Sequence, residues 1–151
     1  MILKEIELFK GIRPEVMNQI ADICSEENYS KGVVLFKKGE KAENLYILEE
    51  GSVHLVIGNG GTITYTLKEP GQVFGWSSMV ELGQYTASGV CATDLKVLKI
   101  ERDWLDKIFS QYPDAGLQIL KRLAAVISQR LTNVYNDLLS ARKQDTTPSY
   151  G

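Results

Sequence analysis

The sequence contains few of the residues that bind metal ions or form disulfides. Its 151 residues include two cysteines and one histidine. Cys24 and Cys91 lie in segments with periodic apolar residues and lack CxxC spacing, so we expect buried free thiols. His54 stands alone on a predicted strand, where a structural or exposed role is far commoner than metal ligation. The sequence therefore predicts no metal, and it argues against a β-roll dioxygenase, which needs several inward histidines or glutamates.

The sequence also lacks a strong excess of charge and any long apolar run. It has 17 basic and 19 acidic residues, a net charge of −2, which argues against a dedicated surface for nucleic acid or anionic membranes. No run approaches the roughly 18 apolar residues of a membrane span. Charges interrupt the apolar residues of "MILKEIELFKGI", unlike a signal peptide, and no GxSxG motif supports a catalytic triad. We expect a cytoplasmic protein that is not an enzyme.

Glycines divide the middle of the sequence into short segments rich in β-branched and aromatic residues. Turn signals recur at the spacing of a β-sandwich or barrel, at Gly32, Gly39, Gly51 and Pro70-Gly71. Asn59-Gly60, between "VHLVI" and "TITYTL", favours a hairpin, because a type I′ turn needs positive φ at both central residues. The segment "SGVCATDLKVLKI" predicts a closing strand pair around Thr93-Asp94. Residues 31–101 are therefore expected to form a β-roll.

Helical periodicity flanks this β-rich segment on both sides. Residues 1–30 repeat apolar side chains at three- and four-residue steps, with Pro14 in a first-turn position. Residues 102–140 combine a short helix, which would act as a hinge, with a long helix that begins at Pro113. Residues 141–151 form a polar tail that is expected to be disordered, and no helix-turn-helix follows the long helix. The predicted fold is mainly β with flanking α: a double-stranded, jelly-roll-like β-roll between two helical segments.

The long helix carries an apolar stripe with alternating steps of three and four residues. This a/d heptad pattern is typical of a dimer seam, and its members are Leu117, Leu120, Ala124, Ile127, Leu131, Val134 and Leu138. A second flank could pack on the β-roll through Ile119, Leu123 and Val126. A single wide core-facing stripe is the alternative, but a compact domain of this size rarely needs so long a helix. We therefore predict a homodimer through this helix.

Residues 74–88, "FGWSSMVELGQYTAS", predict a loop around a very short helix. Free N–H groups at the start of such a helix can hold an anion. The only charged side chain in the segment is Glu81, which has the wrong sign for that task. Ser78 and Glu81 have the spacing of a capping box, which would turn Glu81 back onto its own helix.

The order of these elements resembles the cyclic-nucleotide-binding domain of the catabolite-activator and fumarate-nitrate-regulator sensors. The resemblance rests on "LFKGI", "YSKGVVLFKKGEKAENLYILEEGSVHL", "PGQVFG", "YTASGVCATDLKVLKI" and the final helix, over about residues 7–140. In that family residues 74–88 would be the phosphate-binding cassette. The resemblance implies ligand contacts at Phe74, Gly75, Trp76, Ser77, Ser78, Tyr85, Thr86 and Ala87. It also places Thr132 and Tyr135 over the pocket mouth, although an exposed helix tyrosine is an equally common finding.

Two positions depart from the pattern of that family. Trp76 stands where the cassette glutamate takes the ribose hydroxyl, and Tyr85 stands where the cassette arginine pairs with the cyclic phosphate. Either the two rings line a remodelled pocket, or they fill it. We predict a dimeric sensor module that does not bind cyclic AMP with the affinity of a charged cassette, and whose ligand, if any, is unknown. The alternative is a ligand-free dimerisation or docking module of the same fold.

Overall fold

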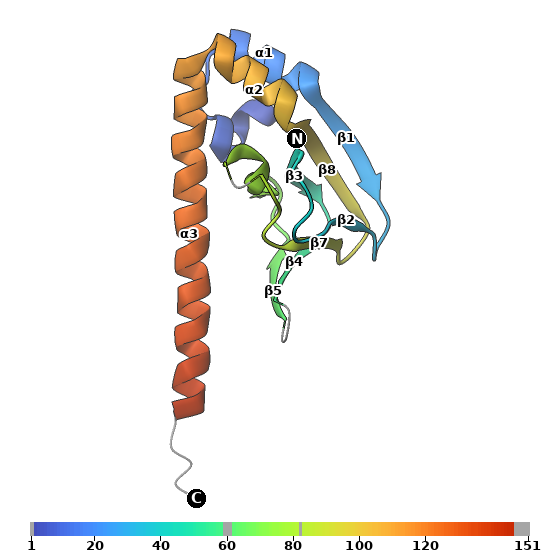
Figure 1. The fold of residues 1–151 in the computed structure, drawn as a ribbon, viewed down its shortest axis with the longest axis vertical. Helices are drawn as coiled ribbons and strands as arrows, with labels where there is room; N and C mark the ends of the chain where they lie inside the picture. The colour runs from blue at the N-terminus through green and yellow to red at the C-terminus, as the bar shows by residue number, and fades with distance from the viewer. Residues whose placement is uncertain (1, 59–61, 82, 147–151) are drawn as a thin grey trace, which may run out of the picture.

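The computed structural model describes residues 2–58, 62–81 and 83–146. Within these ranges, eight strands form two four-stranded antiparallel sheets that close into a β-roll (Figure 1). The first sheet contains, in order, β1 (Cys24–Tyr29), β8 (Leu95–Glu101), β3 (Asn44–Glu50) and β6 (Val73–Phe74). The second contains β2 (Val34–Phe36), β7 (Ser88–Cys91), β4 (Val53–Ile57) and β5 (Ile63–Leu67). The predicted mainly-β roll with an N-terminal helix and a long C-terminal helix is confirmed.

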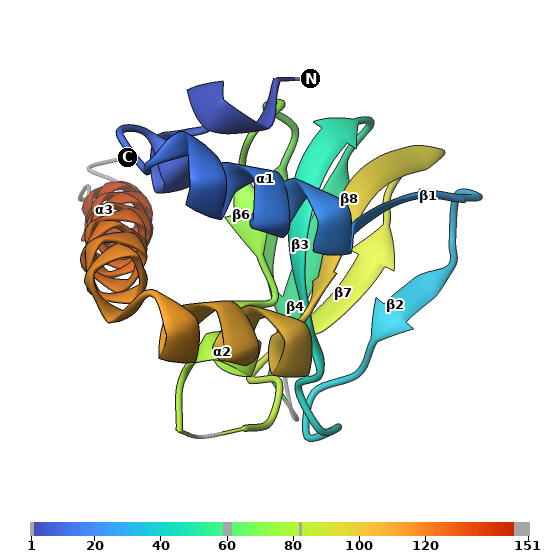
Figure 2. The ribbon, with the colours of Figure 1, turned by 90° about the horizontal axis from the view of Figure 1, so that it is seen from above.

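Helices cover one side of the roll. Two 3-10 turns, η1 (Leu3–Glu5) and η2 (Glu7–Phe9), precede α1 (Pro14–Ile23), whose first position is the predicted proline. A third 3-10 turn, η3 (Trp76–Met79), follows β6, and α2 (Arg102–Gln111) follows β8. The last helix, α3 (Pro113–Thr146), runs along the roll and extends beyond it (Figure 1). Seen from above, α1 and α2 lie side by side over the first sheet, and α3 stands next to both (Figure 2).

Strand β3 separates two apolar cores because its side chains alternate between its two faces. Leu45 and Ile47 point to the helices, where they join a cluster with Phe9, Ile20 and Leu123. Tyr46 and Leu48 point instead into the roll, where a second cluster contains Phe36, Val53, Phe74, Tyr85 and Val97. Below, the first is called the helix-side core and the second the roll core.

Three expectations about the bounds and the pairing of elements need correction. The helical segment expected over residues 1–30 ends at Ile23, and residues 24–29 form β1 instead. Polar "CSEENY" becomes a strand because it pairs with β8 along its length, with ion pairs Lys99–Glu27 (2.9 Å) and Lys96–Glu26 (3.3 Å). Strands β7 and β8 are not partners of each other but belong to different sheets. The expected polar tail is helical as far as Thr146.

The remaining expectations about elements agree with the structure or fall outside it. Strands β4 and β5 pair as an antiparallel hairpin, while the predicted turn residues Asn59-Gly60 lie outside the described residues. Both cysteines are free, Cys91 being buried and Cys24 half-buried. No helix in the described part of the chain is long and apolar enough to cross a membrane.

Candidate functional site

The short helix predicted within residues 74–88 is η3, and a glycine starts it. Gly75 adopts the left-handed conformation (φ 73°) directly after β6. A Cβ at this position would lie 3.0 Å from the Asn44 carbonyl oxygen and 3.1 Å from the Tyr46 ring. Only glycine combines that backbone angle with so close an approach of two strands. The turn therefore fixes where η3 leaves the sheet.

The predicted capping box does not form. The residue that precedes η3 is Gly75, and it makes no side-chain cap. Ser78 lies inside the helix, and its hydroxyl donates a hydrogen bond back to the Gly75 carbonyl (2.9 Å). Glu81 lies beyond the end of η3 with an exposed side chain. Ser77 and Ser78 are both buried, so this turn is held by its serines and its glycine rather than by a carboxylate.

Tyr85 lies inside the β-roll. Its ring stacks on that of Phe36, with centroids 4.0 Å apart and planes 19° from parallel. Phe36 in turn stacks on Tyr46, and Tyr46 on Phe74. We call these four residues the aromatic cluster. Its members come from strands of both sheets and from the cassette-like loop, and each is buried. They account for much of the roll core.

The hydroxyl group of Tyr85 is fully engaged with the backbone of Asn44. It donates to the Asn44 carbonyl (2.8 Å) and accepts from the Asn44 N–H (3.1 Å). Burial raises the pKa of Tyr85, so the phenol is neutral at physiological pH. Tyr85 thus contributes an apolar ring whose polar atom is already satisfied.

Trp76 lies on the other side of the first sheet. It packs against the helix-side core, whereas Tyr85 belongs to the roll core. The guanidinium carbon of Arg130, from α3, lies 4.4 Å from the Trp76 ring centroid and 5.7 Å from that of Tyr65 on β5. The idea that Trp76 and Tyr85 line a single pocket therefore does not match their positions.

Sequence reasoning missed Arg130, although the sequence contains a signal for it. Ile119, Leu123 and Val126 form the predicted second flank of the long helix. Ile119 and Leu123 are buried in the helix-side core, which also contains Leu45 and Ile47 of β3. Arg130 follows Val126 by four residues and continues the same face. A basic residue at a core-facing helical position marks a buried charge, which needs a partner.

The other cassette positions and the proposed lid residues differ in exposure. Phe74 is buried in the aromatic cluster, Thr86 is exposed and Ala87 is half-buried. On α3, the Thr132 hydroxyl donates to the Ser128 carbonyl within its own helix (3.0 Å), and Tyr135 is exposed. The contact of Thr132 and Tyr135 with a ligand remains a prediction.

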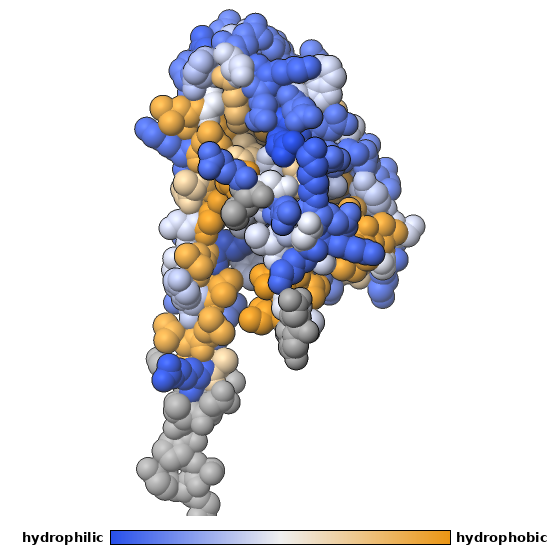
Figure 3. All heavy atoms as spheres, viewed as in Figure 1, coloured by the Kyte–Doolittle hydropathy of each residue, from blue (hydrophilic) through white to orange (hydrophobic). Residues whose placement is uncertain are grey.

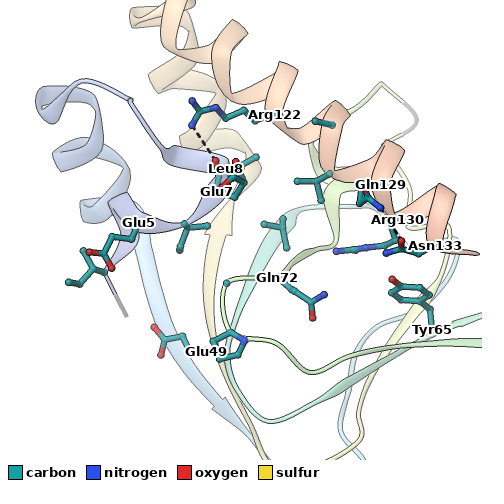
Figure 4. A pocket seen from close by; sticks show the side chains of 17 residues that line it. Glu5, Glu7, Leu8, Glu49, Tyr65, Gln72, Arg122, Gln129, Arg130 and Asn133 are labelled. Atoms are coloured by element: carbon teal, nitrogen blue, oxygen red, sulfur yellow. Dashed lines mark hydrogen bonds between the residues drawn. The ribbon is translucent and has the colours of Figure 1, made fainter.

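A cavity of about 850 Å³ lies between α3, the segment containing η1 and η2, and the turn between β5 and β6 (Figure 4). Its lining includes Arg122, Gln129 and Arg130 from α3, and Tyr65 and Gln72 from the roll. Among residues 74–81 and 83–88, which the structure describes, none lines it. The cavity is therefore separate from the cassette-like loop, and the two regions meet at Arg130, which touches Trp76 from the cavity wall.

The apolar stripe of α3 is largely uncovered in the single chain. Leu117, Leu120, Leu131 and Leu138 are exposed by 57, 39, 48 and 55%. Ala124 is also exposed, and Ile127 and Val134 are half-buried. Figure 3 shows apolar side chains following α3 down its length. A continuous apolar surface on a helix is typical of a protein contact.

The single histidine has a hydrogen-bonding role on the roll. Its Nδ1 lies 2.9 Å from the Thr66 hydroxyl on the neighbouring strand. The part of the chain that the structure describes contains no group of three histidine, cysteine, aspartate or glutamate side chains suited to a metal ion.

Known proteins share this fold and sequence pattern. Residues 26–112 match the family model described as the cyclic nucleotide-binding domain. A CRP-like cAMP-activated global transcriptional regulator of Mycobacterium tuberculosis is 25% identical over 91% of this chain and 60% of its own length. Glutaminase 1 of Bradyrhizobium diazoefficiens is 25% identical over 92% of this chain and 22% of its own length. The chain thus spans less than two thirds of either relative.

A solved structure agrees over nearly its entire chain. A protein of Geobacter metallireducens GS-15, provisionally named as a cyclic nucleotide-binding protein, superposes with a TM-score of 0.76 and 30% identity. The match covers 87% of this chain and 99% of that one.

Proposed function

We propose, from the premise that this chain belongs to the cyclic nucleotide-binding domain family, that it is a non-catalytic regulatory module. In this proposal it acts as a cytoplasmic homodimer through α3, and it does not bind cyclic AMP with the affinity of a charged cassette. The observation that carries the proposal is the position of Tyr85, whose ring stacks on Phe36 inside the roll with its hydroxyl bonded to Asn44.

The energetic consequence follows from the two missing charged side chains. Hydrogen bonds to charged groups contribute about 1.5–3 kcal/mol each. Losing two of them weakens binding by roughly a hundredfold to ten-thousandfold. A phosphate in the roll would also be buried without a counter-charge, which adds a desolvation cost. It would have to displace Tyr85 from a ring stack worth about 0.5–1.5 kcal/mol. Each of these free-energy terms weakens the binding of cyclic AMP.

Dimerisation is supported by the length and exposure of α3. The helix has 34 residues and is about 50 Å long at 1.5 Å per residue. Its first half packs on the roll through Ile119 and Leu123, while its exposed leucines continue towards the C-terminal end. A second copy of the chain, presenting the same stripe, would cover these leucines in a symmetric contact.

The regulatory mechanism places α3 between the ligand-sensing face and the dimer contact. Arg130 contacts Trp76 on one face of the helix, and Leu131 and Leu138 lie on the exposed stripe. A ligand that prefers one position of the helix would shift the population of dimer arrangements. The alternative is a docking or dimerisation module without a ligand, which the filled roll core around Tyr85 favours.

Calorimetric titration with cyclic AMP tests the proposal. We expect no saturable heat below about 100 μM ligand, a hundredfold above micromolar affinity, with the mycobacterial regulator as the positive control. The double variant Trp76→Glu, Tyr85→Arg restores both charged side chains and should bind at least tenfold more tightly than the unmodified chain. Micromolar binding of cyclic AMP to the unmodified chain would overturn the argument from the missing charges.

A further inference from the structure

Arg130 is a half-buried cation with no counter-ion among the described residues. Its Nη1 atom is inaccessible to solvent and has no hydrogen-bond partner. No described carboxylate lies within ion-pair distance of its guanidinium group. Burial lowers the pKa of Arg130 to about 10, so the side chain is still protonated at pH 7. A buried charge in this state is normally paired.

The stack of Arg130 on Trp76 offsets only part of this cost. A guanidinium group over an aromatic face is attracted to the ring, and the 4.4 Å spacing to Trp76 is a close contact. The ring face, however, accepts no N–H bond in the plane of the guanidinium group. Arginine carries five N–H donors in a fixed planar fork that matches a carboxylate. The N–H donors of Nη1 are therefore unsatisfied in the present position, and a shift of the side chain towards the cavity would bring them to a ligand.

The cavity beside Arg130 has polar groups at one end and apolar groups along its walls. Figure 4 shows Gln129 and Asn133 on α3 near Arg130, with Tyr65 and Gln72 facing them from the roll. Apolar wall residues come from the N-terminal segment, the roll and α3: Ile2, Ile6, Leu8, Val73, Ala125 and Val126. A volume of about 850 Å³ is within the range of sites for small organic ligands.

The acidic residues of the lining limit the charge of a ligand. Glu5, Glu7 and Glu49 lie on the side of the cavity opposite Arg130 (Figure 4). Glu7 is paired with Lys10 (2.9 Å). The nearest described cation to Glu49 is on Lys96 (4.0 Å). A dianion such as phosphate would meet these three carboxylates as well as the guanidinium groups of Arg122 and Arg130. A monoanion with an apolar body fits the fork and the walls without that repulsion.

We propose that this cavity binds an amphiphilic monocarboxylate, with Arg130 as the residue that holds its carboxylate and with its apolar part against the walls. The site is separate from the cassette-like loop. Carboxylate binding would draw the guanidinium group away from Trp76 and would bear on the position of α3. The regulatory meaning of the site rests on the proposed sensor function, whereas binding itself does not.

Fluorescence of Trp76 provides a direct measurement. The chain has two tryptophans, and Trp104 is a half-exposed surface residue that stacks with Lys107. In a Trp104→Phe background, octanoate should change the Trp76 emission saturably and raise the melting temperature. Octanoate should bind more tightly than hexanoate, by about fourfold for each added methylene. Neither 1-octanol nor octylamine should reproduce the fluorescence change.

Variants of α3 separate anchoring by Arg130 from a general effect of charge. Arg130→Gln should weaken octanoate binding by at least tenfold, the loss expected for a charge-assisted bond. Lys121→Gln removes an exposed cation from the same helix outside the cavity and should leave binding unchanged. Arg130→Lys keeps the charge but not the fork and should give an intermediate affinity. It also provides the comparison if Arg130→Gln does not fold, as judged by circular dichroism.

Several results would overturn the proposal. One is that 1-octanol and octanoate bind equally well, and another is that both Arg130 variants bind octanoate as the unmodified chain does. A third is that inorganic phosphate or cyclic AMP changes the Trp76 fluorescence at lower concentration than octanoate does. If the unmodified chain forms a dimer but does not bind octanoate, the proposed site is refuted and the proposed function is unaffected. Octanoate binding that never alters the dimer would support the site and count against the sensor function.

Discussion

Replacing Tyr85 by phenylalanine tests whether this ring is anchored in the roll rather than available to a ligand. The substitution removes one hydroxyl and keeps the ring. It deletes the bond donated to the Asn44 carbonyl (2.8 Å) and the bond accepted from the Asn44 N–H (3.1 Å). Both backbone groups are half-buried, so water replaces these bonds only in part.

The magnitude follows from the two bonds. Each contributes about 0.5–1.5 kcal/mol net, and an unsatisfied buried group adds to the loss. We expect Tyr85→Phe to lower the free energy of unfolding by about 1–3 kcal/mol. In a domain of this size, each kcal/mol lowers the melting temperature by about 2–4 °C. The expected decrease is therefore about 2–12 °C, measured by calorimetry at a fixed protein concentration because dimerisation also affects melting.

A second tyrosine provides the matched control. The Tyr112 hydroxyl accepts a bond from the Gln19 side chain (3.1 Å), so this bond joins two half-buried side chains and leaves no backbone group unpaired when it is removed. Tyr112→Phe should cost less than about 1 kcal/mol. If Tyr85→Phe changes stability no more than Tyr112→Phe does, the phenol is not anchored by Asn44. The argument that the roll interior is filled by a fixed ring would then fail.

Three further predictions concern the dimer, a buried acid and the glycine turn. Leu131→Glu introduces a charge into the exposed stripe and should convert a dimer to a monomer in light scattering, whereas Lys121→Glu should not. Burial raises the pKa of Glu49. The neutral carboxyl group therefore contributes its full stability below the unfolded pKa of 4.5, and this stability is lost as the pH rises through the folded pKa. Glu49→Gln should raise the melting temperature at pH 7 but not at pH 4. Gly75→Ala places a Cβ on a left-handed residue 3.0 Å from the Asn44 carbonyl oxygen. It should lower the free energy of unfolding, measured with urea, by about 1–3 kcal/mol. A decrease below 0.5 kcal/mol, about the size of an ordinary surface substitution, would contradict the strain argument.

Local patterns in the sequence were enough to predict most of the elements. The turn glycines and the alternating apolar residues predicted the strands of the roll, because both signals arise from neighbouring residues. Pro14 and Pro113 each stand at the first position of a helix, where the fixed φ of proline is favourable. The buried flank of Ile119 and Leu123 followed from helical spacing alone.

The misses involve residues whose environment is set by distant parts of the chain. Residues 24–29 have the composition of a solvated loop, and they form β1 because β8 supplies both backbone partners and the lysines that pair with Glu26 and Glu27. Ser78 and Glu81 were expected to form a capping box at the start of a helix. Instead, Gly75 precedes the first residue of η3, so the helix begins three residues earlier than expected. Both outcomes depend on tertiary contacts that local propensity does not contain.

By itself, the sequence determined the order of the elements, the apolar stripe of α3 and the presence of Trp76 and Tyr85 in the cassette-like loop. Only the tertiary structure decided what those aromatics do: Tyr85 lies in the roll core and Trp76 under Arg130 in the helix-side core. The physical reason is that the first sheet has an apolar core on each face, and neither residue lies in a strand whose alternation would assign it to a face. Two residues of one loop can therefore pack on opposite faces of this sheet. Only the packing of all the strands and helices fixes which residue lies on which face.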